Sequence, residues 1–309
     1  MITGGAALVA VALVLRATDW SAAFATLRHA CVALVALTGA ITLVSAIVKG
    51  VRWWLFLRRS TALELRHAVS LTLVGSGLNS MLVANAGDVA RVGLAARQAR
   101  APVISVLGAL AGDKASDVAA FATMCLALLI VHPPRRGAGI MLGIVGMCTL
   151  GLVALFVVGS RASPAAVMSD GRKRGLLGSG ADYVTRLFVL TRAHLRGADG
   201  ALAYALSLLS WAAQVATYWM GALAVDVHLP IMAAVTAVVL VNLAGVLRAT
   251  PGNIGVFQAM YVLALEPFDI AASSALPAAV AVQLAQLLSS LLAGAAALPM
   301  LDRSRPRLA

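Results

Sequence analysis

The sequence is poor in charged residues and rich in apolar ones. Of its 309 residues, 12% are Asp, Glu, Lys or Arg and 61% are hydrophobic, and the mean hydropathy is +0.94. A soluble domain of this length could not bury so much apolar surface. The composition therefore excludes a soluble enzyme or binding domain and indicates a protein that crosses a membrane several times.

Acidic residues are the scarcer of the two kinds of charge. There are 12 Asp and Glu against 24 Lys and Arg, which gives a formal net charge of +12. In a soluble protein such an excess would suggest nucleic acid as a partner. In a membrane protein the enrichment of Lys and Arg in cytoplasmic loops explains it, and we expect no nucleic-acid partner.

Cysteine is rare too. Cys31, Cys125 and Cys148 lie in apolar segments and show neither Cys-x-x-Cys nor Cys/His spacing, which metal sites and redox motifs require. We interpret them as small core residues. The sequence also has no His-Glu-x-x-His motif, and we expect no metal and no cofactor.

The alternation of apolar and polar residues that marks membrane β-strands is absent as well. Apolar runs of about twenty residues recur instead, and in lipid such runs satisfy their backbone hydrogen bonds as helices. We predict an all-α integral membrane protein. Its full transmembrane helices, about six in number, are expected at residues 4–20, 30–48, 102–131, 137–159, 201–225 and 277–301.

Shorter apolar segments remain, and we expect them to form two re-entrant or broken-helix hairpins: 68–84 with 87–100, and 231–247 with 252–265. A full crossing by the first pair would leave three arginines of the segment 87–100 on the outer side, against the positive-inside rule. The first hairpin would then open towards the cytoplasm and the second towards the outside. Such an arrangement is typical of an inverted repeat.

We predict one polytopic membrane domain over residues 1–309, with possible repeat halves at 1–159 and 201–309. The basic segment 160–200 would join them in the cytoplasm and carry an amphipathic helix at about 181–194. We expect this helix to lie on anionic lipid headgroups.

The loops also indicate the location of the protein. The basic cluster from Lys49 to Arg66 is expected in the cytoplasm, with Trp53 and Trp54 as anchors at the membrane interface. Both termini would be cytoplasmic.

Polar residues interrupt the apolar pattern at 79–91 and at 248–258. In the second interruption Pro251 removes an amide and Gly252 frees φ, which breaks a helix and leaves backbone groups that need polar partners or a cavity. A kink without a ligand is the alternative. The residues that we expect to break or shape the helices are Gly87, Pro251, Gly252, Asn253 and Gly255.

Three charged residues lie within the apolar segment 102–131. At 100° per residue Asp113, Lys114 and Asp117 share one narrow helix face, with Lys114 and Asp117 spaced for an ion pair. Exposure to lipid would cost roughly 2.5–3.5 kcal/mol for each, so they must face protein or water. They form either an ion-pair network that fixes helix packing or the wall of a cavity for a charged headgroup.

Arg91 and Arg248 are the candidate partners for the excess negative charge of this segment. Asp88 precedes Arg91 by three residues, so the two could pair with each other, or Asp88 could cap a helix N-terminus. The glutamines of the apolar segments are expected to make hydrogen bonds between helices. They are Gln214, Gln283 and Gln286.

Three motifs, in this order along the chain, resemble the lysylphosphatidylglycerol synthase transmembrane (flippase-like) family. They are Gly77-Leu78-Asn79-Ser80-Met81-Leu82 followed by Gly87-Asp88-Val89-Ala90-Arg91, then Asp113-Lys114 with Asp117, and then Pro251-Gly252-Asn253-Ile254-Gly255-Val256-Phe257. The resemblance covers nearly the whole chain. It implies an integral protein of a bacterial inner membrane that moves an amphiphilic lipid between leaflets.

The resemblance also implies a lipid headgroup as the ligand. Together with the charges above it gives the candidate substrate-binding residues Asn79, Asp88, Arg91, Asp113, Lys114, Asp117, Arg248 and Gln258. The chain departs from the family at Val83-Ala84, where a Pro-Gly pair is usual, and at Gln258, where Glu is frequent. The first departure removes a helix breaker from the first hairpin, and the second removes a charge.

We therefore expect a lipid translocase that moves a polar or charged membrane lipid, with its phosphate near Arg91 and Arg248 and a cationic group near Asp113 and Asp117. We expect no enzyme: no catalytic residue is predicted, and the soluble aminoacyl transferase domain of bifunctional family members has no counterpart after Leu301. Two alternatives stay open. One is a membrane-embedded enzyme acting on a lipid-linked substrate, with a divalent metal at the two carboxylates, and the other is a non-transporting partner of a lipid-biosynthesis enzyme.

Overall fold

The computed structural model describes residues 28–82, 86–131, 138–160, 180–245 and 251–302. All regular structure in these ranges is helical, which confirms the predicted fold class. The elements are α3 (Val32–Leu57), α4 (Leu65–Met81), α5 (Ala86–Ala99), α6 (Val103–Val131), α7 (Ala138–Val158), α9 (Gly180–Leu195), α10 (Ala198–Leu223), α11 (Ile231–Gly245), η1 (Pro251–Asn253), α12 (Val256–Leu265), η2 (Glu266–Phe268) and α13 (Ala272–Asp302).

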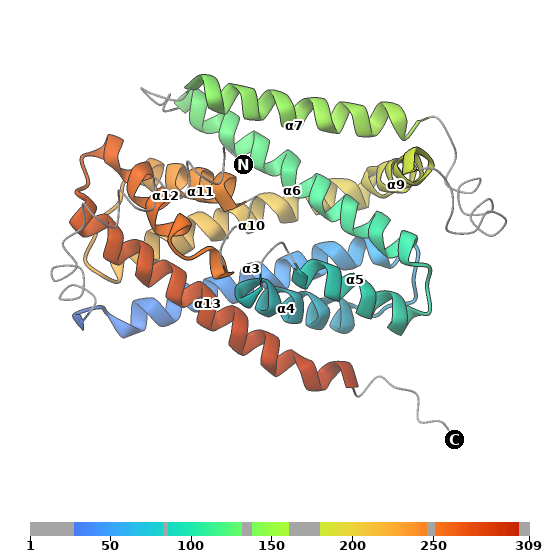
Figure 1. Cartoon of the computed structure of the whole chain (residues 1–309), viewed down its shortest axis with the longest axis horizontal. Coiled ribbons are helices and arrows are strands. Elements are labelled where there is room, and N and C mark those ends of the chain that lie inside the picture. The colour runs from blue at the N-terminus through green and yellow to red at the C-terminus, as the bar shows by residue number, and fades with distance from the viewer. Residues whose placement is uncertain (1–27, 83–85, 132–137, 161–179, 246–250, 303–309) are drawn as a thin grey trace.

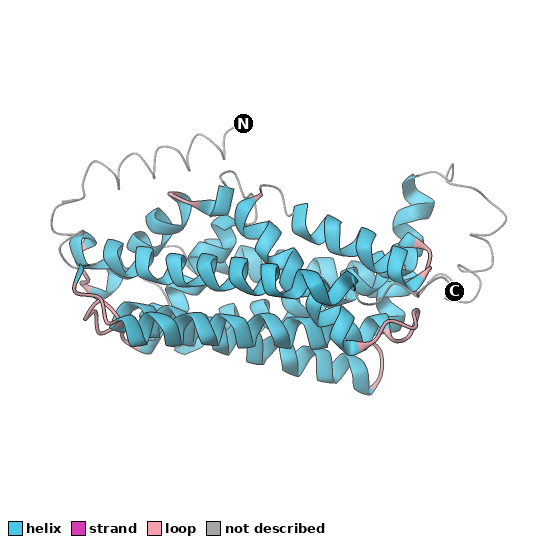
Figure 2. Ribbon diagram, turned by 90° about the horizontal axis from the view of Figure 1, so that it is seen from below, coloured by secondary structure: helices cyan, strands magenta, loops and turns pink. Residues whose placement is uncertain are grey.

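The axes of the long helices lie roughly along the longest axis of the molecule, as two perpendicular views show (Figures 1 and 2). Helices α3, α6, α10 and α13 are long and apolar enough to cross a membrane, and the 21 residues of α7 are also strongly apolar in composition. Together they correspond to five of the six predicted spans. The span predicted at 4–20 lies outside the described residues.

Helix α3 is longer than the span predicted at 30–48. It continues to Leu57 and carries Arg52 and Trp53 into the bundle, where both side chains are buried. The expectations that Arg52 lies in a cytoplasmic loop and that Trp53 is an anchor at the membrane interface are therefore wrong. An arginine in an apolar run resembles the end of a span, but here it has carboxylate partners on a neighbouring helix.

Helices α4 and α5 form the first hairpin. They are antiparallel, because Gly75 of α4 contacts Gly87 at the start of α5, while Thr72 earlier in α4 contacts Arg91 later in α5. Helix α4 ends at Met81, followed by extended backbone with φ −102° and ψ 160°. The helix thus breaks even without the Pro-Gly pair, whose counterpart, Val83-Ala84, lies outside the described residues.

Helices α11 and α12 form the second hairpin, with the turn η1 at its tip. Gly252, Asn253 and Gly255 have positive φ values of 60°, 58° and 86°, which interrupts the helix before α12. Glycine adopts this conformation without a steric penalty, and asparagine tolerates it better than most residues. The chain thus leaves the helical conformation within the segment where the sequence predicts a break.

The two hairpins open at opposite ends of the bundle, and their tips meet between the long helices (Figure 1). A Cβ on Gly252 would lie 3.1 Å from the carbonyl oxygen of Ser80 at the end of α4. The first hairpin opens towards the end that holds α9, and the second towards the end that holds η2. Opposite openings fit an inverted repeat, although the division into repeat halves stays a prediction.

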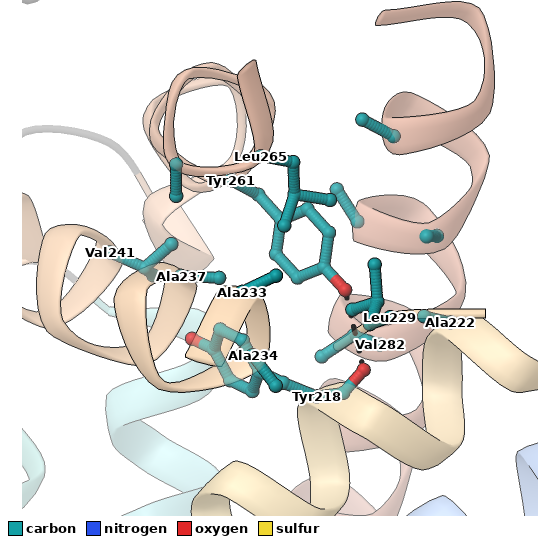
Figure 3. Packing of buried hydrophobic residues seen from close by; sticks show 14 of the residues in the cluster. Tyr218, Ala222, Leu229, Ala233, Ala234, Ala237, Val241, Tyr261, Leu265 and Val282 are labelled. Atoms are coloured by element: carbon teal, nitrogen blue, oxygen red, sulfur yellow. Dashed lines mark hydrogen bonds between the residues drawn. The ribbon is translucent and has the colours of Figure 1, made fainter. Parts of the chain in front are cut away.

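An apolar core holds the second hairpin against α10 and α13. Tyr218 and Tyr261 are fully buried in it, and the Tyr261 hydroxyl donates a hydrogen bond to the Tyr218 carbonyl oxygen at 3.3 Å (Figure 3). Ala233, Ala234 and Ala237 of α11 line the same core and let the helices approach closely. This packing fixes the position of the tip.

Arg59 ties the end of α3 to the junction between α9 and α10. Its guanidinium pairs with Asp199 at 2.9 Å and donates to three backbone carbonyl oxygens of residues 193–196. Arg58 pairs with the same carboxylate at 2.6 Å. Helix α9, close to the range predicted for the amphipathic helix, is thereby held on the ends of the long helices.

His194 of α9 is a buried imidazole at this end. Its ring packs edge-on against Phe56 with a centroid distance of 5.8 Å, and its Nδ1 has no hydrogen-bond partner among the described residues. Burial and the nearby Arg59 lower the pKa of His194 from 6.5 to about 4. Below pH 6.5 the unfolded chain therefore binds a proton that the folded protein does not. The free energy of unfolding should fall by about 3 kcal/mol as the pH drops from 6.5 to about 4, and then level off.

Thermal unfolding of the detergent-purified protein at about pH 7.5 and about pH 4.5 measures this loss. The His194→Gln variant should lose less stability between the two conditions than the wild type. His228→Gln, which removes an exposed imidazole, is the matched control and should behave like the wild type. Identical pH dependence in the wild type and His194→Gln would contradict the prediction.

Candidate functional site

A polar cavity of about 550 Å³ lies where the hairpin tips meet the long helices. Both hairpins contribute to its wall, together with α3, α6, α10 and α13. Most of the other lining side chains carry hydroxyl or amide groups. The charged side chains of the wall are Lys49, Arg52, Asp88, Arg91, Asp113, Lys114 and Asp117.

Arg52 of α3 binds both carboxylates of α6. Its Nε lies 2.6 Å from Asp113 Oδ1, and its Nη1 lies 2.6 Å from Asp117 Oδ1. Nη1 also donates to Ser207 Oγ of α10 at 2.7 Å, and only 2% of the Arg52 side chain is exposed. Charge-assisted hydrogen bonds from one guanidinium thus join three long helices.

Arg91 of α5 brings the first hairpin into the same network. Its Nη2 lies 3.3 Å from Asp113 Oδ2, and its Nε lies 3.1 Å from Asp88 Oδ1. The guanidinium carbon sits 4.6 Å from the centroid of the Trp53 ring, a distance at which the aromatic face attracts a cation. Asp113 therefore shares its two oxygens between two arginines.

Lys114 of α6 pairs with Asp88 of the first hairpin rather than with Asp117. Its Nζ lies 2.8 Å from Asp88 Oδ2. The predicted pairing of Lys114 with Asp117 is wrong, because Arg52 already occupies the Asp117 carboxylate. The Lys114 side chain is 53% exposed and is the most accessible member of the network.

Lys49, one turn before Arg52 on α3, lines the same cavity. Thr42 and Ser45 precede it at helical spacing and also line the wall, so α3 presents one polar face to the cavity. Within the described residues the Lys49 ammonium makes no hydrogen bond and no ion pair.

A chain of amide groups stabilises the break in the second hairpin. Gln283 of α13 donates from Nε2 to the Gly252 carbonyl oxygen at 2.8 Å and accepts a hydrogen bond from Gln258. Gln258 in turn accepts from the Gly255 amide at 2.7 Å. Two backbone groups that the helix break frees are thereby satisfied.

Comparison with models of known protein families assigns the chain to a family. A family model described as Lysylphosphatidylglycerol synthase TM region matches residues 1–294. The chain belongs to this family. Comparisons with curated proteins and with solved structures give no match. Membership agrees with the resemblance of the three motifs and with a multi-pass membrane protein of a lipid-handling family.

In this member of the lysylphosphatidylglycerol synthase TM region family, the structure brings most predicted binding residues together. Those that line the cavity are Asn79, Asp88, Arg91, Asp113, Lys114 and Asp117, and Gly252 and Asn253 of the second tip also lie in its wall. Gln258 is not in the wall but supports the start of α12. Arg248 lies outside the described residues.

Asn79 has a structural contact besides its place in the wall. Its Oδ1 accepts a hydrogen bond from the Gly87 amide at 2.8 Å, so the end of α4 caps the start of α5. Gln258 plays the corresponding part in the second hairpin. In both hairpins a side-chain amide satisfies a backbone amide at the helix break.

Sequence reasoning missed two cations, Lys49 and Arg52. The signal was the helical spacing of Thr42, Ser45, Lys49 and Arg52, which continues the predicted span beyond residue 48 on one polar face.

Gln214 of α10 donates to Asn242 of α11 at 3.4 Å, and with Gln283 it confirms two of the predicted interhelical contacts. No group of three or more His, Cys, Asp or Glu in the described ranges is placed to hold a metal ion.

Proposed function

We propose that the protein is a lipid translocase. A polar or charged membrane lipid would place its headgroup in the cavity while its acyl chains stay in the bilayer. The observation that carries this proposal is the cavity itself: it is polar, it lies among helices that cross the membrane, and its wall is shared by two hairpin tips that come from opposite ends. Sites of this kind near the bilayer midplane are typical of transporters built from inverted repeats.

The charge of the two ends supports an orientation for the proposed translocase. Residues at the α9 end include Arg58, Arg59, Arg66, Arg97, Arg100 and Arg196 with Glu64 and Asp199, whereas the end near η2 carries Asp226, Glu266 and Asp269 with Arg28. By the positive-inside rule the α9 end faces the cytoplasm, across an inner membrane. Helix α9 would then rest on anionic headgroups of the cytoplasmic leaflet.

Movement of the tips supplies the mechanism that we propose. The two tips approach each other where Gly252 lies against the Ser80 carbonyl oxygen, at the wall of the cavity. A headgroup that enters on one side would pass when one hairpin shifts against the other, and the ion pairs of Arg52 would keep the surrounding long helices in place. The lipid would drive this shift only by binding one arrangement more tightly than the other.

Proteoliposomes test the proposal. Vesicles containing the purified protein should equilibrate acyl-labelled phospholipids between leaflets faster than protein-free vesicles, with a panel that includes anionic, aminoacylated and isoprenoid lipids. If vesicles with and without the protein showed equal rates for every lipid of the panel, translocation would be refuted. If the protein then co-purified with a lipid-biosynthesis enzyme, a non-transporting partner would be the better assignment.

A substitution at the tip gives a sharper prediction. Ser80 lines the cavity, and among the described residues its hydroxyl bonds to the Ser76 carbonyl oxygen of its own helix, so Ser80→Trp should fill the passage without removing a tertiary contact. A barrier to passage that is higher by about 1.4 kcal/mol or more corresponds to transport that is about tenfold slower or more.

The control is Met81→Trp, one residue further, where the side chain is 61% exposed and does not line the cavity. This variant should transport at the wild-type rate, and both variants should retain the wild-type Tm. Wild-type transport by Ser80→Trp would show that the tip does not control passage.

A further inference from the structure

Lys49 is the only charged side chain of the cavity wall without an ionic partner among the described residues. The other six are all in ion pairs with one another. Lys49 lies on α3 one turn from Arg52, and its side chain is half-buried against the cavity. Its ammonium offers hydrogen-bond donors that no side chain of the wall uses.

The carboxylates of the wall are all occupied. Asp113 is bound by Arg52 and Arg91, Asp117 by Arg52, and Asp88 by Arg91 and Lys114. A cationic group on a ligand would compete with these cations for carboxylates that they already neutralise. An anionic group meets no such competition at Lys49.

The net charge of the cavity wall also favours an anionic ligand. The described wall holds four cationic and three anionic side chains, and the excess positive charge acts in a surrounding of low dielectric. The remaining polar wall is neutral. Its hydroxyl and amide groups include Thr42, Ser45, Asn242, Gln286 and Ser290, and such groups suit hydroxyl and ester oxygens rather than a second charge.

We propose that the cavity selects a net anionic lipid headgroup that carries phosphate and no cationic group, with the phosphate bound at the Lys49 ammonium. This inference rests on the proposed function for the statement that the ligand is a lipid, and it names the class of that lipid. It replaces the expectation from the sequence that Asp113 and Asp117 receive a cationic group of the cargo. Phosphatidylglycerol has the required chemistry, and an aminoacylated derivative of it does not.

Lipid binding to the detergent-purified protein, measured by native mass spectrometry, tests the selection without requiring transport. The probes are phosphatidylglycerol, zwitterionic phosphatidylcholine and cationic lysylphosphatidylglycerol, with equal acyl chains. The wild type should bind phosphatidylglycerol about tenfold more tightly than the other two, as expected for one charge-assisted contact. Equal affinities, or a preference for the cationic lipid, would overturn the inference.

Substitutions at Lys49 assign the preference to this residue. Lys49→Met should lose the preference for phosphatidylglycerol, and Lys49→Arg, which keeps the charge, should retain it. Because Lys49 has no partner to leave unpaired, the Tm without lipid should not change, and Lys49→Gln serves in its place if Lys49→Met fails to fold. Arg66→Gln, at a 75% exposed arginine outside the cavity, is the control and should bind like the wild type. Retained selectivity in Lys49→Met and Lys49→Gln would overturn the assignment.

Two further arms separate the possible outcomes. Glycerol 1-phosphate that binds more tightly than phosphatidylglycerol would show a site for a soluble phosphate and overturn the lipid class. Weak competition by glycerol 1-phosphate, with tight lipid binding, supports it. Selective binding at Lys49 in a protein that fails to move lipid in proteoliposomes would leave this inference intact and refute only translocation.

Discussion

Replacement of Arg52 by Met should lower the free energy of unfolding by about 3–5 kcal/mol, the cost of leaving a buried charge without its partner. Arg52 is 2% exposed and binds Asp113 and Asp117, each at 2.6 Å. Without it Asp113 keeps only the longer contact with Arg91 and Asp117 keeps none of its ionic contacts. The hydrogen bond from Arg52 of α3 to Ser207 of α10 is lost as well.

The Tm of the detergent-purified variant, followed by the loss of the monodisperse peak in size-exclusion chromatography, measures this effect. The control Arg66→Met breaks the exposed pair of Arg66 with Glu64 and should cost at most about 1 kcal/mol. The triple variant Arg52→Met, Asp113→Asn, Asp117→Asn removes the orphaned charges too and should recover part of the loss. An Arg52→Met protein as stable as Arg66→Met would show that the network does not hold the helices together.

Replacement of Gly87 by Ala should separate the two helices of the first hairpin. A Cβ at this position would lie 2.0 Å from the Gly75 carbonyl oxygen and 2.7 Å from Asn79 Oδ1. The nearer atom is backbone and cannot rotate away, so α5 must move. We expect a destabilisation of about 3 kcal/mol, at the upper end of the usual cost of overpacking, together with the loss of transport because Asn79 no longer caps α5.

Gly93 offers a matched control on the same helix, since nothing lies within 4 Å of a Cβ built there. Gly93→Ala should be neutral or stabilise the protein by about 0.5–1 kcal/mol, because alanine favours the helix. Thermal unfolding of both variants and their transport rates in proteoliposomes check the pair. Equal stability of Gly87→Ala and Gly93→Ala would contradict the close contact of α4 with α5.

The sequence predicted the presence of the long helices and of the two hairpins, but not the full length of α3. Apolar runs of membrane length predict α6, α10 and α13 closely, and Pro251-Gly252 predicts the break before α12. The first hairpin was harder, because the feature that ends α4 is the extended backbone after Met81 rather than a helix-breaking residue. Its position followed from the charges of α5, which could not all lie on the outer side.

The candidate site was predicted only in part, because composition does not reveal pairing. The charges of α6 had to face protein or water, and they do. Which cation meets which carboxylate depends on how α3, α5 and α6 pack, and no local pattern encodes that. Arg52 lies beyond the apparent end of its span, so hydropathy assigned it to a loop.

The order in which the paired charges are synthesised has a consequence for membrane insertion. Arg52 precedes its partners Asp113 and Asp117 by 61 and 65 residues, so it leaves the ribosome before either carboxylate exists. Arg91 differs, because its partner Asp88 is synthesised before it. An unpaired arginine costs up to roughly 2.5–3.5 kcal/mol in a bilayer on the insertion scale. Helix α3 should therefore reach its final depth only when α6 joins it.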